Sequence, residues 1–392
     1  MSSHTQHPEL TVVMPCLNEA DTIRVCVRKA LQAMREAGIS GEVVVADNGS
    51  NDDSIKIAQE EGARVVHISL KGYGHALTGG IAAAKSPLIL MGDADDSYDF
   101  LELPKFFKKL QEGAQLVQGC RLPAGGGEIA LGAMPWSHRW IGNPLFSTLV
   151  RCWFRAPIHD VYCGMRAFTK ELHEKLNLQC RGMEFATEMI IKASVTGARI
   201  SEVPITLHKD GRISHPPHLR TIRDGWRTLR FFLMYSPRWL FLVPGFVLLG
   251  LAVIGFALGL GQARPLGILA DAHTLLFAAL CAVCGYQAIW FAVFTKVFVI
   301  REKLLPEDPR FDRLFRFLNL ERGLALGFMA LLAGIAGLMW SLFSWQQGGG
   351  LTAIFSYSSL LSWVIPSSTL TILGFQTILS SFLVSILGIH RE

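Results

Sequence analysis

The chain has 392 residues, a net charge of +5 and eight cysteines that show no paired spacing. This length exceeds one average domain, and the modest charge, without a basic stripe interleaved with aromatic residues, argues against nucleic acid as a partner. We expect reduced cysteines, because a large cytosolic domain needs no disulfide framework.

The composition changes near Arg238. Before it, charged, polar and apolar residues are mixed, and beyond it long apolar stretches dominate and give a mean hydropathy of +0.33. The polar start, MSSHTQHPEL, lacks the apolar core of a secretory signal. We therefore expect a cytosolic catalytic domain at residues 1–208, an acceptor loop with an amphipathic helix at 209–238, and a membrane domain at 239–392.

Apolar, β-branched runs alternate with helix-forming runs through the first half. Strands are expected at Leu10–Leu17, Glu42–Gly49, Arg64–Ser69, a run ending at Asp93, Ala114–Leu122 and Ile200–Leu207. Helices are expected up to about Arg35, at Ser54–Glu61, up to Ala84, at about Ser137–Phe154 and at Glu184–Ser194. This alternation predicts an α/β domain with a mostly parallel, Rossmann-like sheet and right-handed crossovers.

The stretch from Leu88 to Tyr98 reads LILMGDADDSY. It predicts a buried strand that delivers Asp93 and Asp95 to its carboxyl end, where open α/β sheets bind ligands. Side chains two apart on a strand share a face, so both carboxylates could hold one hard cation together with water and substrate phosphates. The alternative is a strand that runs into a solvated acidic turn.

Polar residues follow the ends of the other expected strands. They are Asn18 and Glu19, Asp47 and Asn48, and Lys71. In a parallel sheet these ends share one edge, so a single cleft is expected. A GxGxxG fingerprint and a Walker loop are both absent from the sequence, which favours a cation on Asp95 over a glycine cradle as the pyrophosphate ligand. Asp47 and Glu19 could bond to a base and ribose, or each could be an ordinary turn or helix cap.

The motifs PCLNEADTI, ADNGSNDDS, KGYGHALTGGIAAA and MGDADDSYDF occur in this order. Together they resemble the nucleotide-sugar half of family 2 glycosyltransferases with the GT-A fold. More narrowly, Leu10 to Trp239 resembles the polyisoprenyl-phosphate glycosyltransferases, the group of dolichyl-phosphate mannose and glucose synthases. One departure is Ser97, which stands where mannose synthases of this group typically have Gln, so the sugar stays open.

The resemblance implies a set of site residues on the donor side. The nucleotide-sugar contacts would be Pro15, Leu17, Asn18, Glu19, Asp47, Asn48, Lys71, Asp93 and Ala94. Asp93 and Asp95 would hold the Mg²⁺ or Mn²⁺ on the diphosphate of the donor. Asp95 thereby counts among the catalytic residues.

On the acceptor side, HDVYCGMRAF matches the family motif through Asp160, Gly164 and Arg166. Asp160 is the candidate base, but an acceptor phosphate with a second pKa of about 6 is already ionised at neutral pH. We therefore expect Asp160 to orient the acceptor and the metal shell. The expected lipid-phosphate ligands are Arg121, Arg139, Asn143, Arg212 and Ser214. The glycine-rich stretch Pro123–Pro135 is either a mobile lid or a linker.

The second half predicts a helical membrane domain. Leu219–Leu233 has apolar residues on one side and arginines on the other, which indicates an interfacial helix or one packed on the soluble domain. Four spans are expected, at about 240–260, 274–300, 324–343 and 369–389. The short, serine-rich segment Leu351–Ile365 is expected to be interfacial or re-entrant.

The basic residues predict the orientation of these spans. The connection after the second span carries Lys296, Arg301, Lys303, Arg310, Arg313, Arg316 and Arg322, and the connection after the first carries Arg264 alone. We therefore expect a multi-pass protein of the inner (cytoplasmic) membrane, with the catalytic domain and both termini cytosolic. The sequence leaves the oligomeric state open, a homo-oligomer included.

The expected function is transfer of one hexose from a UDP- or GDP-sugar to a polyprenyl phosphate such as undecaprenyl or dolichyl phosphate, with inversion and a divalent metal. A processive polysaccharide synthase is one alternative. Its QxxRW motif is not matched, because Trp136 and Tyr235 stand at the Gln position before the two Arg-Trp pairs. A non-catalytic lipid-binding membrane protein is the other alternative, and the intact Asp93 and Asp95 argue against it.

Overall fold

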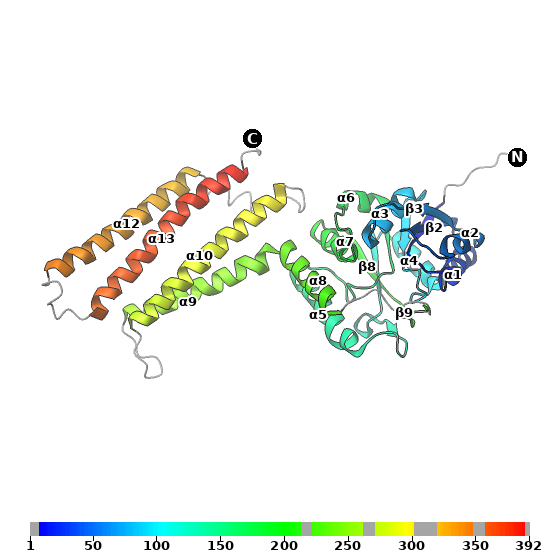
Figure 1. The fold of residues 1–392 in the computed structure, drawn as a ribbon, viewed down its shortest axis with the longest axis horizontal. Helices are drawn as coiled ribbons and strands as arrows, with labels where there is room; N and C mark the ends of the chain where they lie inside the picture. The colour runs from blue at the N-terminus through cyan, green and yellow to red at the C-terminus, as the bar shows by residue number, and fades with distance from the viewer. Residues whose placement is uncertain (1–7, 213–220, 262–270, 302–319, 348–356, 389–392) are drawn as a thin grey trace. The chain divides into compact units, whose positions relative to one another are not determined.

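The computed structural model describes residues 8–212, 221–261, 271–301, 320–347 and 357–388 (Figure 1). The chain divides into two compact units, Met1–Phe232 and Leu233–Glu392. The first unit has helices and strands, and the second is helical.

A seven-stranded sheet forms the centre of the first unit, in the order β3-β2-β1-β4-β7-β5-β8. Its strands are β1 (Leu10–Cys16), β2 (Gly41–Asp47), β3 (Arg64–His67), β4 (Leu88–Met91), β5 (Leu116–Cys120), β7 (Arg166–Thr169) and β8 (Ile200–Pro204). All neighbours pair in parallel except those of β7, which runs antiparallel to β4 and β5. The predicted α/β class with a mostly parallel sheet is confirmed. The sequence interpretation missed β7, which is only four residues long.

Both faces of this sheet are covered, because neighbouring residues of a strand point to opposite sides. On one face Val12 and Met14 join the core cluster that contains Ile23 of α1. On the other, Val13 lies against Gly80 of α3, where an added Cβ would come within 2.6 Å of a Val13 methyl carbon. This two-sided burial explains why the strands read as nearly continuous apolar runs.

The helices α1 to α7 lie between these strands in the chain, and α8 follows the last strand. They are α1 (Ile23–Glu36), α2 (Ser54–Glu60), α3 (Tyr73–Ala83), α4 (Leu103–Gln111), α5 (Asn143–Phe154), α6 (Lys170–Leu176), α7 (Glu184–Val195) and α8 (Thr221–Tyr235). In α8, Phe232 is buried and its ring meets Phe146 and Phe154 of α5 at 5.8 and 6.2 Å. Trp226 of α8 is exposed instead. One side of α8 therefore packs on α5 in the first unit.

Part of the glycine-rich stretch 123–135 forms backbone hydrogen bonds with a neighbouring strand. Its short strand β6 (Glu128–Ile129) pairs in parallel with β9 (Thr206–Leu207). Ala130 N also donates a 2.9 Å hydrogen bond to the carbonyl of Leu207. Residues 128 and 129 of this stretch thus belong to a second, two-stranded sheet.

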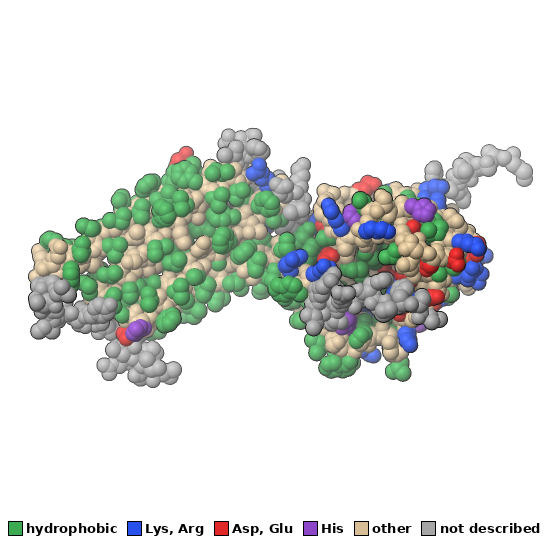
Figure 2. All heavy atoms as spheres, in the orientation of Figure 1, with side chains coloured by type: hydrophobic (Ala, Val, Ile, Leu, Met, Phe, Trp, Pro, Cys, Tyr) green, Lys and Arg blue, Asp and Glu red, His purple; other side chains and the backbone are tan. Residues whose placement is uncertain are grey.

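The second unit contains α9 (Val243–Leu260), α10 (Ala272–Arg301), α12 (Leu320–Gln347) and α13 (Tyr357–Gly388). Within the described residues, four helices are long and apolar enough to cross a membrane. Hydrophobic side chains cover them in Figure 2. Glycines bring the helices close: a Cβ on Gly285 would lie 2.8 Å from the carbonyl of Gly245, and one on Gly327 would lie 3.1 Å from that of Gly374. Small contact residues of this kind are typical of membrane helices.

The described part of Leu351–Ile365 is helical, because residues 357–365 belong to α13. The fourth candidate span runs from Leu360 to Leu387, whereas the sequence predicted 369 to 389. Pro366 lies inside this helix and removes one backbone donor. Continuing the helix still costs less than opening the backbone, because hydrocarbon supplies no hydrogen-bond partners.

Candidate active site

The loops after β1, β2 and β4 converge at one edge of the sheet. These strands are neighbours and parallel, so their carboxyl ends lie side by side. Asn18 follows β1 with a left-handed φ of 60° and turns the chain toward α1. Thr22 Oγ1 then donates a 2.6 Å hydrogen bond to the carbonyl of Ala94, which ties this turn to the loop after β4.

Asp93 is a confined carboxylate at this edge. Its Oδ1 accepts a 2.8 Å hydrogen bond from the Tyr73 hydroxyl. Burial and the negative charge of Asp95 raise the pKa of Asp93 to about 6, against the opposite effects of Tyr73 and Arg212. A carboxylate in these surroundings is stabilised by a nearby positive charge.

Asp95 divides its two oxygens between different partners. Its Oδ1 accepts hydrogen bonds from the Ser97 amide at 3.1 Å and the Ser97 hydroxyl at 2.6 Å. Its Oδ2 faces Arg212 Nη1 at 3.4 Å. Ser97, the departure from the mannose synthase pattern, therefore holds one side of Asp95 in place.

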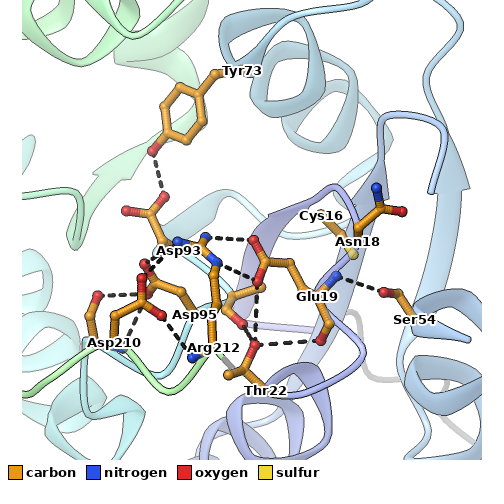
Figure 3. A network of polar contacts seen from close by, with 12 residues as sticks. Cys16, Asn18, Glu19, Thr22, Ser54, Tyr73, Asp93, Asp95, Asp210 and Arg212 are labelled. Atoms are coloured by element: carbon orange, nitrogen blue, oxygen red, sulfur yellow. Dashed lines mark hydrogen bonds and ion pairs between the residues drawn. The ribbon is translucent and has the colours of Figure 1, made fainter. Parts of the chain in front are cut away.

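Arg212 lies in the middle of an acidic cluster (Figure 3). Its Nε and Nη2 reach the two carboxylate oxygens of Glu19 at 2.8 and 2.5 Å. Its Nη1 reaches Asp210 Oδ2 at 2.9 Å in addition to Asp95. The sequence predicted Arg212 as a ligand of the lipid phosphate, and the structure places it against the donor-side residues Glu19 and Asp95.

The segment that carries Arg212 runs along the loop after β4. Tyr98 and Leu207 form an antiparallel bridge. His208 N then donates to the carbonyl of Ser97 at 2.9 Å, and Gly211 N donates to that of Asp95 at 3.0 Å. These backbone bonds position Arg212 next to the paired carboxylates. Ser214 lies outside the described residues.

Asp47 and Asn48 shape the neighbouring loops. Asp47 accepts hydrogen bonds from the amides of Ser50 and Gly49 at 2.9 and 3.2 Å. Burial raises the pKa of Asp47, but these hydrogen bonds and one from His67 have the larger, opposite effect. The pKa of Asp47 therefore lies below its ordinary value. The carboxylate is thus ionised at neutral pH.

Asn48 holds the loop that contains Lys71. Its Nδ2 donates to the carbonyls of Ile68 and Leu70, and its Oδ1 accepts from Gly72 N. Lys71 Nζ donates a 2.6 Å hydrogen bond to the Asn48 carbonyl. Both side chains thus have partners within the protein.

The remaining donor-side residues differ in exposure. Leu17 is exposed, Pro15 is partly buried and the side chain of Ala94 is buried. Through its carbonyl, Ala94 accepts the hydrogen bond from Thr22. Leu17 and Pro15 thus present side-chain surface at this edge, and Ala94 contributes its backbone.

Asp160 and Arg121 form a buried ion pair. Arg121 Nε and Nη2 lie 2.7 and 2.9 Å from the two Asp160 oxygens, and the Arg121 amide donates to Oδ2 at 3.1 Å. Burial lowers the pKa of Arg121, but the charge and hydrogen bonds of Asp160 raise it more. The sequence selected both residues and could not show that they pair with each other.

Two residues that sequence reasoning missed hold this turn. Glu202 Oε1 accepts from the amides of His159 and Asp160 at 2.6 and 3.1 Å. Gln118 Nε2 donates to the Asp160 carbonyl at 3.0 Å. Glu202 belongs to the predicted strand 200–207, but nothing in the local sequence indicates that its carboxylate reaches a turn 42 residues earlier.

Arg139 and Asn143 lie at the start of α5. Arg139 is in a π-helical turn, His138–Gly142, and its guanidinium lies 5.3 Å from the ring centre of Trp140. Asn143 is buried, and its Nδ2 lies 3.3 Å from Met134 Sδ. Within the described residues, no hydrogen bond or ion pair links Arg139 or Asn143 to Asp160 or Arg121.

Known proteins share the motifs of both units. Residues 11–176 match glycosyl transferase family 2, and residues 293–388 match the glycosyltransferase family 2 C-terminal transmembrane region. Over 385 residues the chain is 35% identical to the low-salt glycan biosynthesis hexosyltransferase Agl6 of Haloferax volcanii, covering 97% of this chain and 89% of that protein. The chain belongs to glycosyltransferase family 2.

Two other known proteins match part of this family 2 glycosyltransferase. A dolichyl-phosphate hexose transferase of Haloferax volcanii is 33% identical over 198 residues, which is 50% of this chain and 82% of that protein. A glucosyl-3-phosphoglycerate synthase of Mycobacterium tuberculosis, solved with Mg²⁺ and uridine diphosphate, has 21% identity and a TM-score of 0.45. The match covers 58% of this chain and 79% of the synthase.

Family membership confirms two coarse predictions. The protein is a glycosyltransferase, as its family 2 region and its similarity to Agl6 show. It is also a membrane protein, since a family 2 transmembrane region overlaps three of its four apolar helices.

Proposed function

We propose that this glycosyltransferase moves one hexose from a nucleotide sugar to a polyprenyl phosphate at the cytosolic face of the membrane. One observation carries the proposal: Asp93 and Asp95 lie at the carboxyl edge of a mostly parallel sheet, in a chain that continues into membrane helices. Ligands of open α/β sheets bind at this edge. The similarity to a dolichyl-phosphate hexose transferase supports the acceptor class.

The residues at this edge fit a divalent cation. Asp93 and Asp95 are hard oxygen ligands, and burial together with the charge of Asp95 raises the pKa of Asp93. Within the described part of the chain, no group of three or more acidic, histidine or cysteine residues could hold a metal. Donor diphosphate and water would therefore complete the shell of an Mg²⁺ or Mn²⁺ ion. When bound, this ion neutralises charge on the departing nucleoside diphosphate.

An apolar patch on the catalytic unit supports a lipid acceptor. Trp136 and Trp140 are 68% and 58% exposed, and Ile141 and Leu145 are exposed beside them in sequence. The Arg139 guanidinium lies 5.3 Å from the ring centre of Trp140. Exposed tryptophans next to a cation are typical of segments at the interface between membrane and water. Such a surface fits an acceptor whose tail lies in the bilayer and whose phosphate reaches the cytosol.

The reaction needs no general base on the protein. An oxygen of the ionised acceptor phosphate forms the bond to the anomeric carbon, and the bond from that carbon to the nucleoside diphosphate breaks, which inverts the configuration. Asp160 is fully buried and bonded to Arg121, so its role in this proposal is to hold this arginine. Positive charge near the reacting phosphates is what such a transfer requires.

A panel assay tests the proposal. Purified protein receives Mn²⁺, undecaprenyl phosphate and UDP- or GDP-sugars one at a time, and mass spectrometry detects the lipid product. We expect a single added hexose. Products of growing length would identify a processive synthase instead, and silence across the panel would contradict the acceptor class.

Two matched variants assign the activity to the carboxylates. Asp95→Asn should lower the turnover ~1000-fold, because a loss of about 4 kcal/mol of charge stabilisation corresponds to that factor. Asp96→Asn is the control: Asp96 pairs with Lys29 at 2.8 Å, and Asn tolerates its left-handed φ of 58°. Equal activity of both variants would contradict the metal role of Asp95.

A further inference from the structure

Arg212 is the feature that the proposed reaction leaves unexplained. Its side chain is 11% exposed, and its guanidinium forms ion pairs with Glu19, Asp95 and Asp210. The two nitrogens on Glu19 make a bidentate contact, the geometry in which arginine binds carboxylates best. Arg212 is thus held in a defined position at the donor edge by its ion pairs.

Its position is determined by the same backbone that positions the carboxylates. Gly211 N bonds to the carbonyl of Asp95, and Arg212 N bonds to Asp210 Oδ1 at 2.9 Å. Gly211 also packs closely: a Cβ there would lie 3.0 Å from Thr22 Cγ2. Arg212 cannot approach or leave Asp95 without breaking contacts of this segment or changing its own rotamer.

A guanidinium and a divalent cation compete for the same oxygen. Arg212 Nη1 faces Asp95 Oδ2, and the other oxygen of Asp95 already accepts two hydrogen bonds from Ser97. Two positive charges within a few ångströms of each other repel strongly in a partly buried site. A cation on Asp95 is therefore bound at the expense of the Arg212 contact.

We infer that Arg212 is a built-in competitor of the divalent cation for Asp95 and sets the affinity of the donor edge for that cation. This inference rests on the proposed function, in which Asp93 and Asp95 hold the cation. A nucleoside diphosphate brings negative charge that relieves the repulsion, so cation and nucleotide strengthen each other's binding. By linkage, Arg212 contributes equally to both directions of this coupling.

The experiment measures Mn²⁺ binding and not activity. Electron paramagnetic resonance of free Mn²⁺ gives the dissociation constant for the full-length protein in detergent, with and without UDP. Arg212→Gln should bind Mn²⁺ alone roughly tenfold more tightly, because one repelling charge is removed from a partly buried site. The gain in Mn²⁺ affinity caused by UDP should be smaller in this variant than in the wild type.

Two controls separate local competition from general charge. Arg212→Lys keeps the positive charge and should stay within about threefold of the wild type. Arg199→Gln removes the same charge from an exposed arginine away from the cluster and should change nothing. A tightening by Arg199→Gln equal to that of Arg212→Gln would overturn the inference, as would tightening by Arg212→Lys beyond Arg212→Gln.

The remaining outcomes distinguish the inference from the proposed function. The Asp95→Asn variant shows how much Mn²⁺ binds elsewhere on the protein. If Mn²⁺ binding depends on Asp95 but Arg212→Gln leaves it equal or weaker, the inference alone is wrong. If the wild type, Asp95→Asn and Arg212→Gln bind Mn²⁺ equally with UDP present, the proposed cation site is wrong and the inference falls with it.

Discussion

Gly164 shows how closely the main chain approaches the paired carboxylates. A Cβ on this residue would stand 2.6 Å from Asp93 Oδ2 and 3.1 Å from the Tyr98 hydroxyl oxygen. The Gly164 amide also donates a 2.8 Å hydrogen bond to that hydroxyl. The absence of a side chain lets the acceptor-side motif pack directly against the donor-side carboxylate. Gly164 therefore links the two halves of the candidate site.

Gly164→Ala should impair both catalysis and stability. The added methyl group forces Asp93 or Tyr98 to move, at a cost of about 1–3 kcal/mol in the free energy of unfolding. Because Asp93 is displaced, we expect kcat/KM to fall at least ~10-fold, the factor that corresponds to 1.4 kcal/mol. Steady-state kinetics and thermal unfolding check this result.

A second glycine supplies the matched control. Gly225, in α8, has open space around its Cβ position and no left-handed φ. Gly225→Ala should leave kcat/KM unchanged and stabilise the helix slightly. Full activity of Gly164→Ala would show that Asp93 does not need its observed position.

At the scale of an element, α7 is attached to the preceding loop through one buried carboxylate. Glu188 pairs with Lys192 one turn later at 2.9 Å. Its oxygens also accept hydrogen bonds from the amides of Gln179 and Cys180 at 2.9 and 2.8 Å. Burial raises the pKa of Glu188, but these partners together have the larger, opposite effect. The pKa of Glu188 therefore lies below its ordinary value of 4.5. The ionised carboxylate is thus the form that the folded protein stabilises.

Glu188→Gln should destabilise the catalytic unit by about 3 kcal/mol at neutral pH, because Lys192 loses its charged partner in a buried place. The folded-state pKa of Glu188 lies below the unfolded value, so its contribution is fully present above about pH 5 and is lost as the pH falls through the folded pKa. The difference in Tm between wild type and variant should shrink below about pH 4.5.

An exposed pair provides the comparison for this experiment. Glu112 contacts Lys109 at 2.7 Å, with both side chains more than 40% exposed. Glu112→Gln should leave the Tm nearly unchanged, because an exposed ion pair contributes little to stability. A Tm difference for Glu188→Gln that stays constant from pH 7 to pH 4 would contradict the ionised buried pair.

At the scale of the whole molecule, the distribution of basic residues predicts the topology. The connection between α10 and α12 is rich in Lys and Arg, whereas the connection between α9 and α10 carries Arg264 alone. Basic connections stay in the cytosol. With an even number of spans, we predict that the catalytic unit and the basic connection lie on the same side of the membrane.

Cysteine labelling checks this topology. Glu321→Cys, at the start of α12, and Asp271→Cys, just before α10, flank the two kinds of connection. A membrane-impermeant maleimide should label Glu321→Cys from the same side as the exposed native Cys152 of the catalytic unit, and Asp271→Cys from the opposite side. The labelling of the unchanged protein measures the background from its native cysteines. Labelling of Asp271→Cys together with Cys152 would reverse the predicted topology.

Local pattern was sufficient for the architecture. The alternation of apolar strands and helices predicted the mostly parallel sheet, and the apolar stretches predicted the four membrane helices. The position of Asp93 and Asp95 after a buried strand could be predicted because such a strand has a visible signature in the sequence. The strand β7 was missed, since its four residues carry no periodic signal and pair antiparallel with strands far away in sequence.

What only the tertiary structure decided is which charged residues face each other. Arg121 pairs with Asp160 across 39 residues, and Arg212 pairs with Glu19 across 193. The sequence marks each of these side chains as polar and functional, but their partners depend on the register of β8 and β9 and on the path of the chain after Leu207. Ion pairs form between groups that the fold brings within a few ångströms, and a linear pattern contains no such distance.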